Sequence, residues 1–450
     1  MTVRIGAGAG YAGDRIEPAV ELARDGDLDY LGFVCLGERT LALAQERLAR
    51  GEPGFDPRLR ERMRRVLPHC ADRGTTLVTN MGAADPVGAA EATAAVAEDL
   101  ELDLAVAGVA GSDVRDRLDS VHEETYDGGR VADIEDVVAA DAYLGVEGIV
   151  AAIEAGADVV IADRVADTSL FLAPLVAEFD WSTDPQGGPI GQGVVTAHLL
   201  ECAGQVTGGY FADPGYKDVD GLADLGFPFA EVDADGGLVL TKLPEAGGAV
   251  TARTCTEQLL YEVHDPSAYV TPDAVADFSG VEFSSMGEDR IRVTGASARP
   301  RTDTLKVNVC YEDSHVGEGS IGYAGPGATD RADLAASVVE GRLERRGVEV
   351  DELHVDRVGI DSLHGDIGAR RGAEPYEVRL RVAARCRTER AARAVANEVE
   401  TLYTNGPAGG GGVTTDVRSV VGIASTLIDR DLVEPTVTLH SEDSTVEVPR

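Results

Sequence analysis

Short apolar runs alternate with helical stretches from residue 1 to about residue 180, and this alternation constrains the fold more than any other feature. The runs lie at residues 3–5, 28–36, 75–80, 104–108 and 158–162. Continuous rather than alternating apolar runs are typical of strands in a parallel sheet that helices cover. Five such units favour an open, doubly wound, mostly parallel (Rossmann-like) sheet, since a closed barrel would need eight.

The last third of the chain shows a different pattern. Strands are predicted at 305–311, 353–360, 376–386 and 416–427, with helices at 329–346 and 388–403. Two successive β-α-β units predict a ferredoxin-like α+β part. The alternation from Val378 to Val382 indicates a half-buried antiparallel strand within it.

The chain therefore divides into three predicted parts. Residues 1–210 form the α/β parallel-sheet domain, 211–300 a turn-rich linking and covering region, and 301–450 the α+β domain. Within the first part, residues 112–146 are more polar and irregular, so we expect an insertion with its own helix there.

The charge balance limits the classes of partner. Asp and Glu total 79 against 40 Lys and Arg, a formal net charge of −39, and only Lys217, Lys242 and Lys306 are lysines. Such a surface suits a protein that stays soluble in molar salt, where self-repulsion is screened over a few ångströms. We infer a halophilic setting, and the acidity argues against nucleic-acid binding.

Other global signals predict a cytoplasmic protein without a membrane partner. No apolar run is long enough to span a bilayer, and the N-terminus lacks a basic-then-apolar signal pattern. The six cysteines stand far apart without a Cys-x-x-Cys pair, which is typical of reduced thiols rather than of disulfides or a zinc knuckle.

A glycine-rich turn follows the first strand and precedes a helix. Gly8, Gly10 and Gly13 match the dinucleotide fingerprint in spacing, and Asp14 and Arg15 follow them. Glycines let a backbone or ligand approach closely, and the helix amides beyond would favour an anion. Three interpretations stay possible: a structural tight turn, a cradle for an anion or substrate, and a dinucleotide site. In a dinucleotide site Glu38 would be the acid that binds ribose, but it lies further along the chain than such an acid usually does.

Polar residues also follow the other predicted strands. Glu38, Asn80 with Gly82, and Arg164 with Asp167 stand at strand ends, which converge at one edge of a parallel sheet. A carboxylate there can act as general acid, general base or metal ligand, and an arginine can clamp a carboxylate or phosphate. Alternatively, the acids cap the helices that follow.

Two further groups of residues are candidates. His198 and Glu201 share one helix face at i and i+3, so they could form an acid–base couple or two ligands of a divalent metal. A half-buried histidine bonded to its neighbour is the alternative. The second glycine cluster, which includes Asn405 and Gly409, is either a mobile loop or a segment that contacts a ligand or another domain.

Together these stretches resemble the acyclic terpene utilisation (AtuA-type) family of bacterial and archaeal proteins, in order and over essentially the whole chain. The matching stretches are Gly8–Arg15, Cys35–Thr40, Thr79–Pro86, Arg164–Asp167, His198–Gly209, Glu257–Pro272 and Asn405–Gly412. Asp163 stands where the family leads us to expect a glycine, which weakens a phosphate-binding interpretation of that turn. The resemblance implies a setting in acyclic terpene degradation through branched acyl-CoA intermediates, but it carries over no catalytic residues.

We therefore expect an enzyme that acts on a branched or carboxylated acyl compound, as a carboxylate or CoA thioester, by lyase- or hydratase-type proton transfer. Glu38 or His198 would move the proton, with Glu201 and Asp167 as further catalytic candidates, and Arg164 would hold a carboxylate. The turn from Gly8 to Gly13 would receive the anionic end of the substrate. One alternative is a non-catalytic binding or assembly subunit that supports an acyl-CoA enzyme, and another is an NAD-dependent oxidoreductase. A homo-oligomer, or a complex with an acyl-CoA enzyme, is compatible with the sequence, which does not identify a cofactor or decide whether a divalent metal binds.

Overall fold

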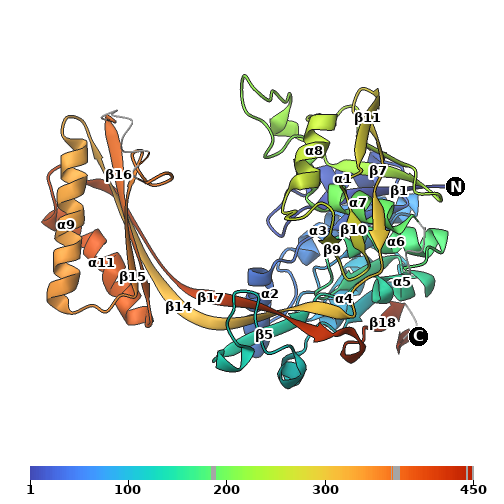
Figure 1. Ribbon diagram of the computed structural model, residues 1–450, viewed down its shortest axis with the longest axis horizontal. Helices are drawn as coiled ribbons and strands as arrows, with labels where there is room; N and C mark the ends of the chain where they lie inside the picture. Colours follow the sequence, from blue (N-terminus) through green and yellow to red (C-terminus); the bar gives the residue numbers. More distant parts are fainter. Residues whose placement is uncertain (184–188, 366, 368–374, 442–443, 448–450) are drawn as a thin grey trace. The chain divides into compact units, whose positions relative to one another are not determined.

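A computed structural model describes the whole chain apart from residues 184–188, 366, 368–374, 442–443 and 448–450 (Figure 1). The chain forms two compact units. The first contains residues 1–134, 138–310 and 424–450, and the second contains 135–137 and 311–423. Two long strands, β14 (Thr304–Ala324) and β17 (Gly411–Asp429), have residues in both units.

The five strands predicted in the first part are all present, and they form the parallel centre of an 11-stranded mixed sheet. In spatial order these strands are β1 (Thr2–Ala9), β2 (Tyr30–Phe33), β3 (Thr76–Thr79), β6 (Val159–Ala162) and β4 (Val106–Ala110). They are buried almost throughout, which explains their continuous apolar sequences.

Antiparallel strands extend this sheet on both sides, which the sequence did not predict. Beyond β1 lie β7 (Pro228–Asp233), β8 (Leu238–Lys242), β12 (Arg290–Thr294) and β11 (Glu282–Gly287), and beyond β4 lie β18 (Thr436–Ser441) and β19 (Ser444–Glu447). The turn-rich region from 211 to 300 therefore adds strands to the main sheet. It also contributes strands to a small separate sheet of β9 (Tyr269–Val270), β10 (Val275–Asp277) and β13 (Ser297–Arg299).

Two groups of helices pack against the main sheet. The first is α1 (Glu17–Asp25), α3 (Leu59–Arg73) and α4 (Pro86–Asp99), and the second is α5 (Glu147–Glu154), α6 (Ser169–Phe179) and α7 (Ile190–Glu201). Helix α2 (Glu38–Ala49) follows β2, and α8 (Ala252–Leu260) packs against α7. Helix α7 is buried along its whole length except at Glu201, because helices and strands surround it.

The strand order reverses at β6, which lies between β3 and β4 although it follows both in the chain. Ligands in parallel α/β sheets bind beyond the carboxyl ends of strands where such a reversal occurs. The residues that follow β3 and β6 are Asn80 and the segment 163–168, so a ligand site is expected at this edge of the sheet.

The second unit contains a sheet in the order β15 (Glu352–Val358), β16 (Glu377–Cys386), β14, β17, packed against α9 (Ala328–Arg346) and α11 (Glu389–Asn405). Strand β16 pairs antiparallel with both neighbours. Val378, Leu380 and Val382 enter the core with the helices, whereas Arg379 and Arg381 bond to polar groups. The predicted half-buried antiparallel strand is confirmed.

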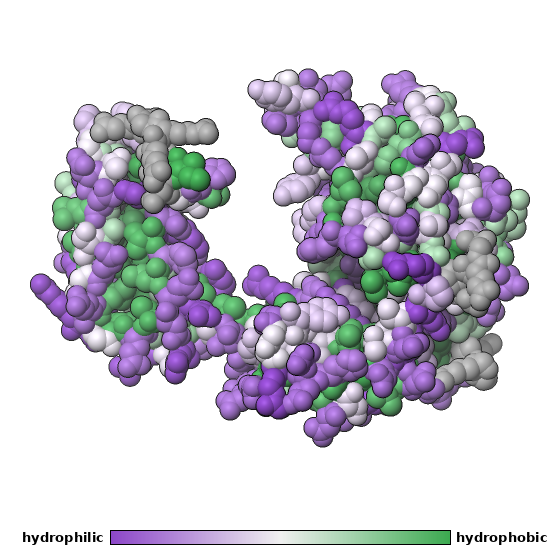
Figure 2. All heavy atoms as spheres, viewed as in Figure 1, coloured by the Kyte–Doolittle hydropathy of each residue, from purple (hydrophilic) through white to green (hydrophobic). Residues whose placement is uncertain are grey.

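Hydrophilic residues cover most of the visible face of each unit (Figure 2). This agrees with a chain in which acids outnumber basic residues by 79 to 40. Within the described ranges, no helix has both the length and the apolar character needed to cross a bilayer.

Candidate functional site

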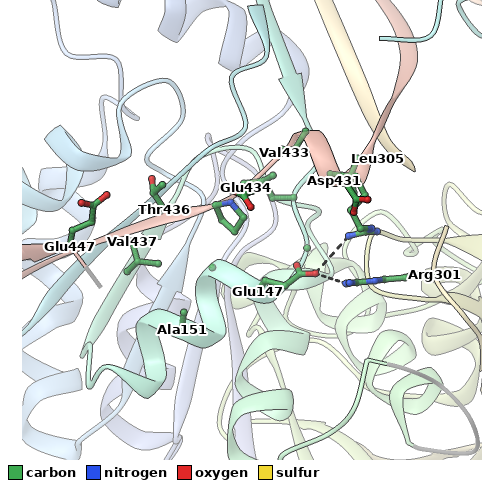
Figure 3. Close-up of a pocket in the computed structure, with 15 residues that line it drawn as sticks. Glu147, Ala151, Arg301, Leu305, Asp431, Val433, Glu434, Thr436, Val437 and Glu447 are labelled. Atoms are coloured by element: carbon green, nitrogen blue, oxygen red, sulfur yellow. Dashed lines mark hydrogen bonds and ion pairs between the residues drawn. The ribbon is translucent and has the colours of Figure 1, made fainter. Parts of the chain in front are cut away.

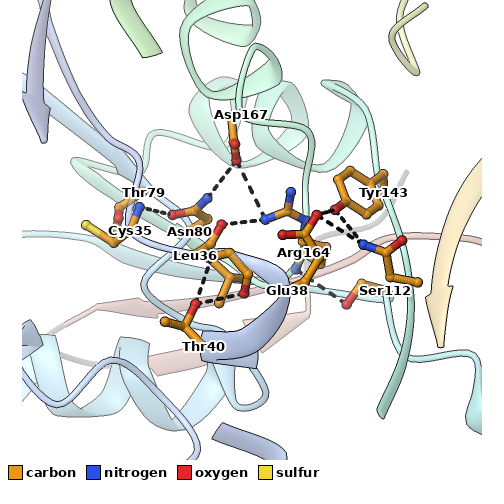
Figure 4. A network of polar contacts seen from close by, with 12 residues as sticks. Cys35, Leu36, Glu38, Thr40, Thr79, Asn80, Ser112, Tyr143, Arg164 and Asp167 are labelled. Carbon is orange, nitrogen blue, oxygen red and sulfur yellow. Dashed lines mark hydrogen bonds and ion pairs between the residues drawn. The ribbon is translucent and has the colours of Figure 1, made fainter. Parts of the chain in front are cut away.

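Four residues predicted at strand ends lie close together in the first unit (Figure 4). Glu38 is the first residue of α2, Asn80 follows β3, and Arg164 and Asp167 follow β6. They converge because neighbouring parallel strands end at the same edge of the sheet.

Arg164 is the centre of this group and is only 4% exposed. Its Nη1 donates to the Leu36 carbonyl at 2.5 Å and lies 3.7 Å from Oδ1 of Asp167. The guanidinium also lies over the ring of Tyr143, 4.0 Å from its centroid, a cation–π contact. A charge held this firmly and kept from water is a strong anchor for an anionic group.

Glu38 is held in its ionised form. Its Oε1 accepts the Tyr143 hydroxyl at 2.5 Å and the Asn308 amide at 3.2 Å. Burial raises the pKa of Glu38, but the Tyr143 hydrogen bond and the Arg164 charge outweigh burial and hold the pKa below its ordinary value. The Glu38 side chain therefore bonds to residues outside its own helix.

Asp167 has the opposite electrostatic behaviour. Burial raises its pKa to about 7, although the charge of Arg164 opposes the rise. Its Oδ1 accepts the Asn80 amide at 3.3 Å, and Asn80 is oriented because its own Oδ1 accepts the Cys35 backbone N–H at 2.7 Å. The pKa values of Glu38 and Asp167 are therefore shifted in opposite directions, as those of a paired base and acid are.

Three residues of this group were not predicted from the sequence. Tyr143 follows β5 (Val137–Ala142), and Lys306 and Asn308 lie on β14. The Asn308 amide also donates to the Tyr143 hydroxyl at 2.8 Å, and the Lys306 ammonium lies 4.8 Å from the centre of the Tyr143 ring. Lys306 could have been found, because a chain with only three lysines makes each of them conspicuous.

The group faces a cavity of about 520 Å³, within the size range of small-molecule sites. Glu38, Tyr143, Arg164, Asp167 and Lys306 line it, and its other walls are Tyr126, Ala166, Thr168, Glu201, Glu262, Tyr269, Val270, Thr271, Pro272, Thr302, Thr304, Leu305 and Leu427. The walls therefore carry charged groups, while tyrosine rings and aliphatic side chains supply apolar surface. We call it the arginine cavity.

His198 lies behind this cavity and is 1% exposed. Its Nδ1 is 2.7 Å from Glu201 Oε1, and its Nε2 is 3.2 Å from the Leu259 carbonyl. Burial lowers the pKa of His198, but the Glu201 charge and hydrogen bond outweigh burial and raise it. Both partner atoms are oxygen acceptors, so each ring nitrogen is placed to donate. Glu201 reaches the cavity, whereas His198 fixes the position of Glu201.

The opening glycine turn lines a second cavity of about 500 Å³ through Gly10, Asp14 and Arg15. Asp167, Glu201 and Glu262 line both cavities. The Gly10 N–H donates to Asp14 Oδ2 at 2.9 Å, so a carboxylate occupies the donor that would bind a phosphate.

The glycines of this turn also have packing reasons. A side chain at Gly8 would collide with the Phe33 ring, and one at Gly10 with the backbone of Cys202. Gly13 would meet Tyr11, and Gly82 approaches the Ala162 carbonyl at the end of β6. Close packing alone therefore accounts for the choice of glycine at these positions.

Asn405 and Gly409 belong to the second unit. Asn405 ends α11 and its carbonyl accepts Arg342 Nη2 at 2.9 Å. Gly409 has a φ of +75°, a backbone conformation that favours glycine. Their predicted contact with a substrate stays a prediction.

In the part of the chain that the structure describes, no three His, Cys, Asp or Glu side chains are grouped as a metal-ligand set. His198 and Glu201 bond to each other, so the predicted pair lacks a third ligand among these residues.

The fold and this cluster define an α/β protein with an arginine-centred polar cavity at the carboxyl ends of parallel strands. The model of the acyclic terpene utilisation family protein AtuA matches residues 3–439, so the chain belongs to this family. Neither a curated protein nor a solved structure matches it. Family membership suggests a role in acyclic terpene utilisation.

Proposed function

We propose that this protein is an enzyme of acyclic terpene or branched-acyl degradation that transfers protons on a carboxylate or acyl thioester, as a lyase or hydratase does. The observation that carries the proposal is the pair of carboxyls that feel the charge of Arg164, with the pKa of Glu38 lowered and that of Asp167, which is ion-paired with Arg164, raised to about 7. Such a pair provides a base and an acid at the same pH.

The charged end of the arginine cavity would bind the polar end of the substrate. Arg164 and Lys306 are its two cations, and both contact the Tyr143 ring. The branched chain would lie against the apolar walls, including Leu305 and Leu427. We assign the anionic end to these cations rather than to the glycine turn, because Asp14 already bonds to the Gly10 N–H.

In a hydration, a water oxygen would bond to the β-carbon of an α,β-unsaturated acyl group while the water proton passes to Glu38. The electron pair of the double bond would take a proton from Asp167 at the α-carbon. The proton on Glu38 would return to Asp167 through solvent, and the reverse sequence is a dehydration. His198 would position Glu201, and Asn80 would position Asp167.

The test combines ligand binding with turnover in concentrated salt. Branched unsaturated carboxylates and their thioesters should raise the melting temperature, since a ligand at about 100 times its Kd adds about 2.7 kcal/mol. Glu38→Gln should slow loss of the conjugated double bond by about 100-fold or more, with the melting temperature nearly unchanged. Glu46→Gln, on the same helix and paired with Arg50, is the matched control and should retain activity.

Absence of any shift with these ligands would remove the support for an enzyme. The chain would then be better explained as a binding or assembly subunit for an acyl-CoA enzyme. A shift with NAD alone would instead favour an oxidoreductase. A large loss of stability in Glu38→Gln would mark Glu38 as structural.

We also propose a finer description of the fold. The parallel strands β1, β2, β3, β6 and β4 with two groups of helices support a doubly wound, Rossmann-like centre. In the second unit, the chain order β14-α9-β15-β16-α11-β17 and the sheet order β15-β16-β14-β17 support a ferredoxin-like arrangement.

A further inference from the structure

A larger cavity, of about 970 Å³, lies in the first unit next to the arginine cavity, and Leu305 lines both (Figure 3). The start of α5, the residues before β14, the 3₁₀ turn η5 (Arg430–Leu432) and strands β18 and β19 supply its walls. Its lining residues are Leu144, Gly145, Glu147, Gly148, Ala151, Arg301, Leu305, Arg430, Asp431, Val433, Glu434, Pro435, Thr436, Val437 and Glu447. We call it the α5 cavity.

Two arginines in this cavity share one carboxylate oxygen. Arg301 Nη1 donates to Glu147 Oε1, and Arg430 Nη1 lies 3.7 Å from the same atom. Figure 3 shows the Glu147 carboxylate pointing toward Arg301. At this point two positive charges face one negative charge, although Asp431, Glu434 and Glu447 also line the cavity.

Arg430 is fixed in place, with its side chain 16% exposed. Its Nη2 donates to the Pro272 carbonyl at 2.5 Å and its Nε to the Thr302 carbonyl at 3.3 Å. Burial, and then the positive charge of Arg301, lower the pKa of Arg430, although the charges of Glu147, Asp273 and Asp303 oppose this. Arg301 is more open at 33% and can turn toward a ligand.

The rest of the cavity is apolar with acids spaced along it. Leu144, Ala151, Val433, Pro435 and Val437 supply aliphatic surface. Asp431, Glu434 and Glu447 add negative charge, and in Figure 3 Glu447 lies beside Val437, away from Arg301. These acids disfavour a ligand with several negative charges, so the lining fits one anionic head on an aliphatic chain.

We propose that the α5 cavity is a binding site for an aliphatic monocarboxylate, separate from the arginine cavity. Its carboxylate bridges Arg301 and Arg430, taking over contacts that Glu147 makes in the free protein, because a two-oxygen anion can bond to both guanidinium groups. Its chain lies along Leu144, Val433 and Pro435.

The proposal predicts opposite effects from two substitutions. Arg301→Gln removes a charge-assisted hydrogen bond to the ligand, so decanoate should bind about tenfold more weakly or not at all. Glu147→Gln removes the competing carboxylate, so decanoate should bind roughly threefold more tightly or better. Arg299→Gln is the matched control, because Arg299 is exposed and bonds to the Ser267 carbonyl.

Isothermal titration of the full chain in concentrated salt, with melting temperatures as a check on folding, measures these effects. Acetate tests the head alone and decanol the tail alone, and both should bind weakly. Decanoate could also enter the arginine cavity, so Lys306→Gln is titrated in parallel. Binding that Lys306→Gln abolishes and Arg301→Gln leaves unchanged would overturn this proposal but not the proposed function. No decanoate binding, or equal effects of Arg301→Gln and Arg299→Gln, would also overturn it.

Discussion

The glycine turn after β1 and the cluster around Arg164 both follow parallel strands, but their polar groups are satisfied in different ways. In the turn, Asp14 accepts the Gly10 and Arg15 N–H groups, and Arg58 and Arg62 donate to the Asp14 carbonyl. The turn therefore satisfies its own hydrogen-bonding groups.

Around Arg164, by contrast, two carboxyls with shifted pKa values face a cavity. A recognisable sequence motif and a site with shifted pKa values are therefore separate properties of this protein. A motif can exist because of packing, whereas shifted pKa values require charges and burial that only the folded chain brings together.

The largest effect is expected from Arg164→Gln. The substitution leaves Glu38 and Asp167 without their shared buried cation, so the free energy of unfolding should fall by about 3–5 kcal/mol, and ligand binding should be lost. Denaturant titration measures the change. Arg115→Gln, which removes an exposed pair with Asp113, should cost less than about 1 kcal/mol. Similar losses of unfolding free energy in both variants would show that Arg164 stabilises the fold no more than an exposed arginine does.

Asp167→Asn should have the next largest effect. With its pKa raised to about 7, Asp167 is protonated below that pH, so kcat/KM should fall as pH rises through about 7. The variant should lose about 100-fold in kcat and lack this limb of the pH profile. A wild-type profile that is flat from pH 6 to 8 would contradict the role of Asp167 as acid.

The same shift makes a prediction about stability. The folded-state pKa of Asp167 lies above the ordinary value of 3.8, so folding favours the protonated form. Relative to Asp167→Asn, the wild type should lose stability as pH rises from about 4 to about 7, and the difference should then stay constant.

Tyr143→Phe should have a smaller effect on kcat/KM, confined to the ionisation of the proposed base Glu38. The ring that lies over Arg164 remains, but Glu38 loses its shortest hydrogen bond, so the pKa of Glu38 should rise toward its ordinary value. The acidic limb of the kcat/KM profile should therefore move to higher pH. Tyr126→Phe, in the wall of the same cavity, should leave that limb in place.

Asp14→Ala should have the smallest effect on activity. The Gly10 and Arg15 N–H groups lose their acceptor, so stability should fall by about 1–2 kcal/mol, while kcat/KM stays within about twofold. A tenfold rise in KM at unchanged stability would show instead that the turn binds substrate, as the glycine motif alone suggested.

Much of the fold and part of the site follow from the sequence. The parallel strands were predictable because each is a continuous apolar run. Because the ends of such strands meet at one edge of the sheet, it was also predictable that four residues would lie close together: Glu38, Asn80, Arg164 and Asp167. The contacts of Tyr143 and Asn308 with Glu38 could not be predicted, because these residues are 105 and 270 positions away from Glu38 in the chain. The antiparallel strands of residues 228–294 were also missed, since short strands among turns carry little information about their partners.

The continuity of β14 and β17 has a consequence for how the protein can be taken apart. Lys306 and Asn308 lie near the start of β14, and Ser425, which bonds to Asn308 at 2.7 Å, lies near the end of β17. Residues 311–423 are thus an insertion whose two ends leave and re-enter the first unit on adjacent strands. Truncation at either terminus would destroy the Arg164 cluster or its support. Replacing the insertion by a hairpin turn would keep every residue of the arginine cavity, so the first unit can be minimised from the middle of the chain rather than from its ends.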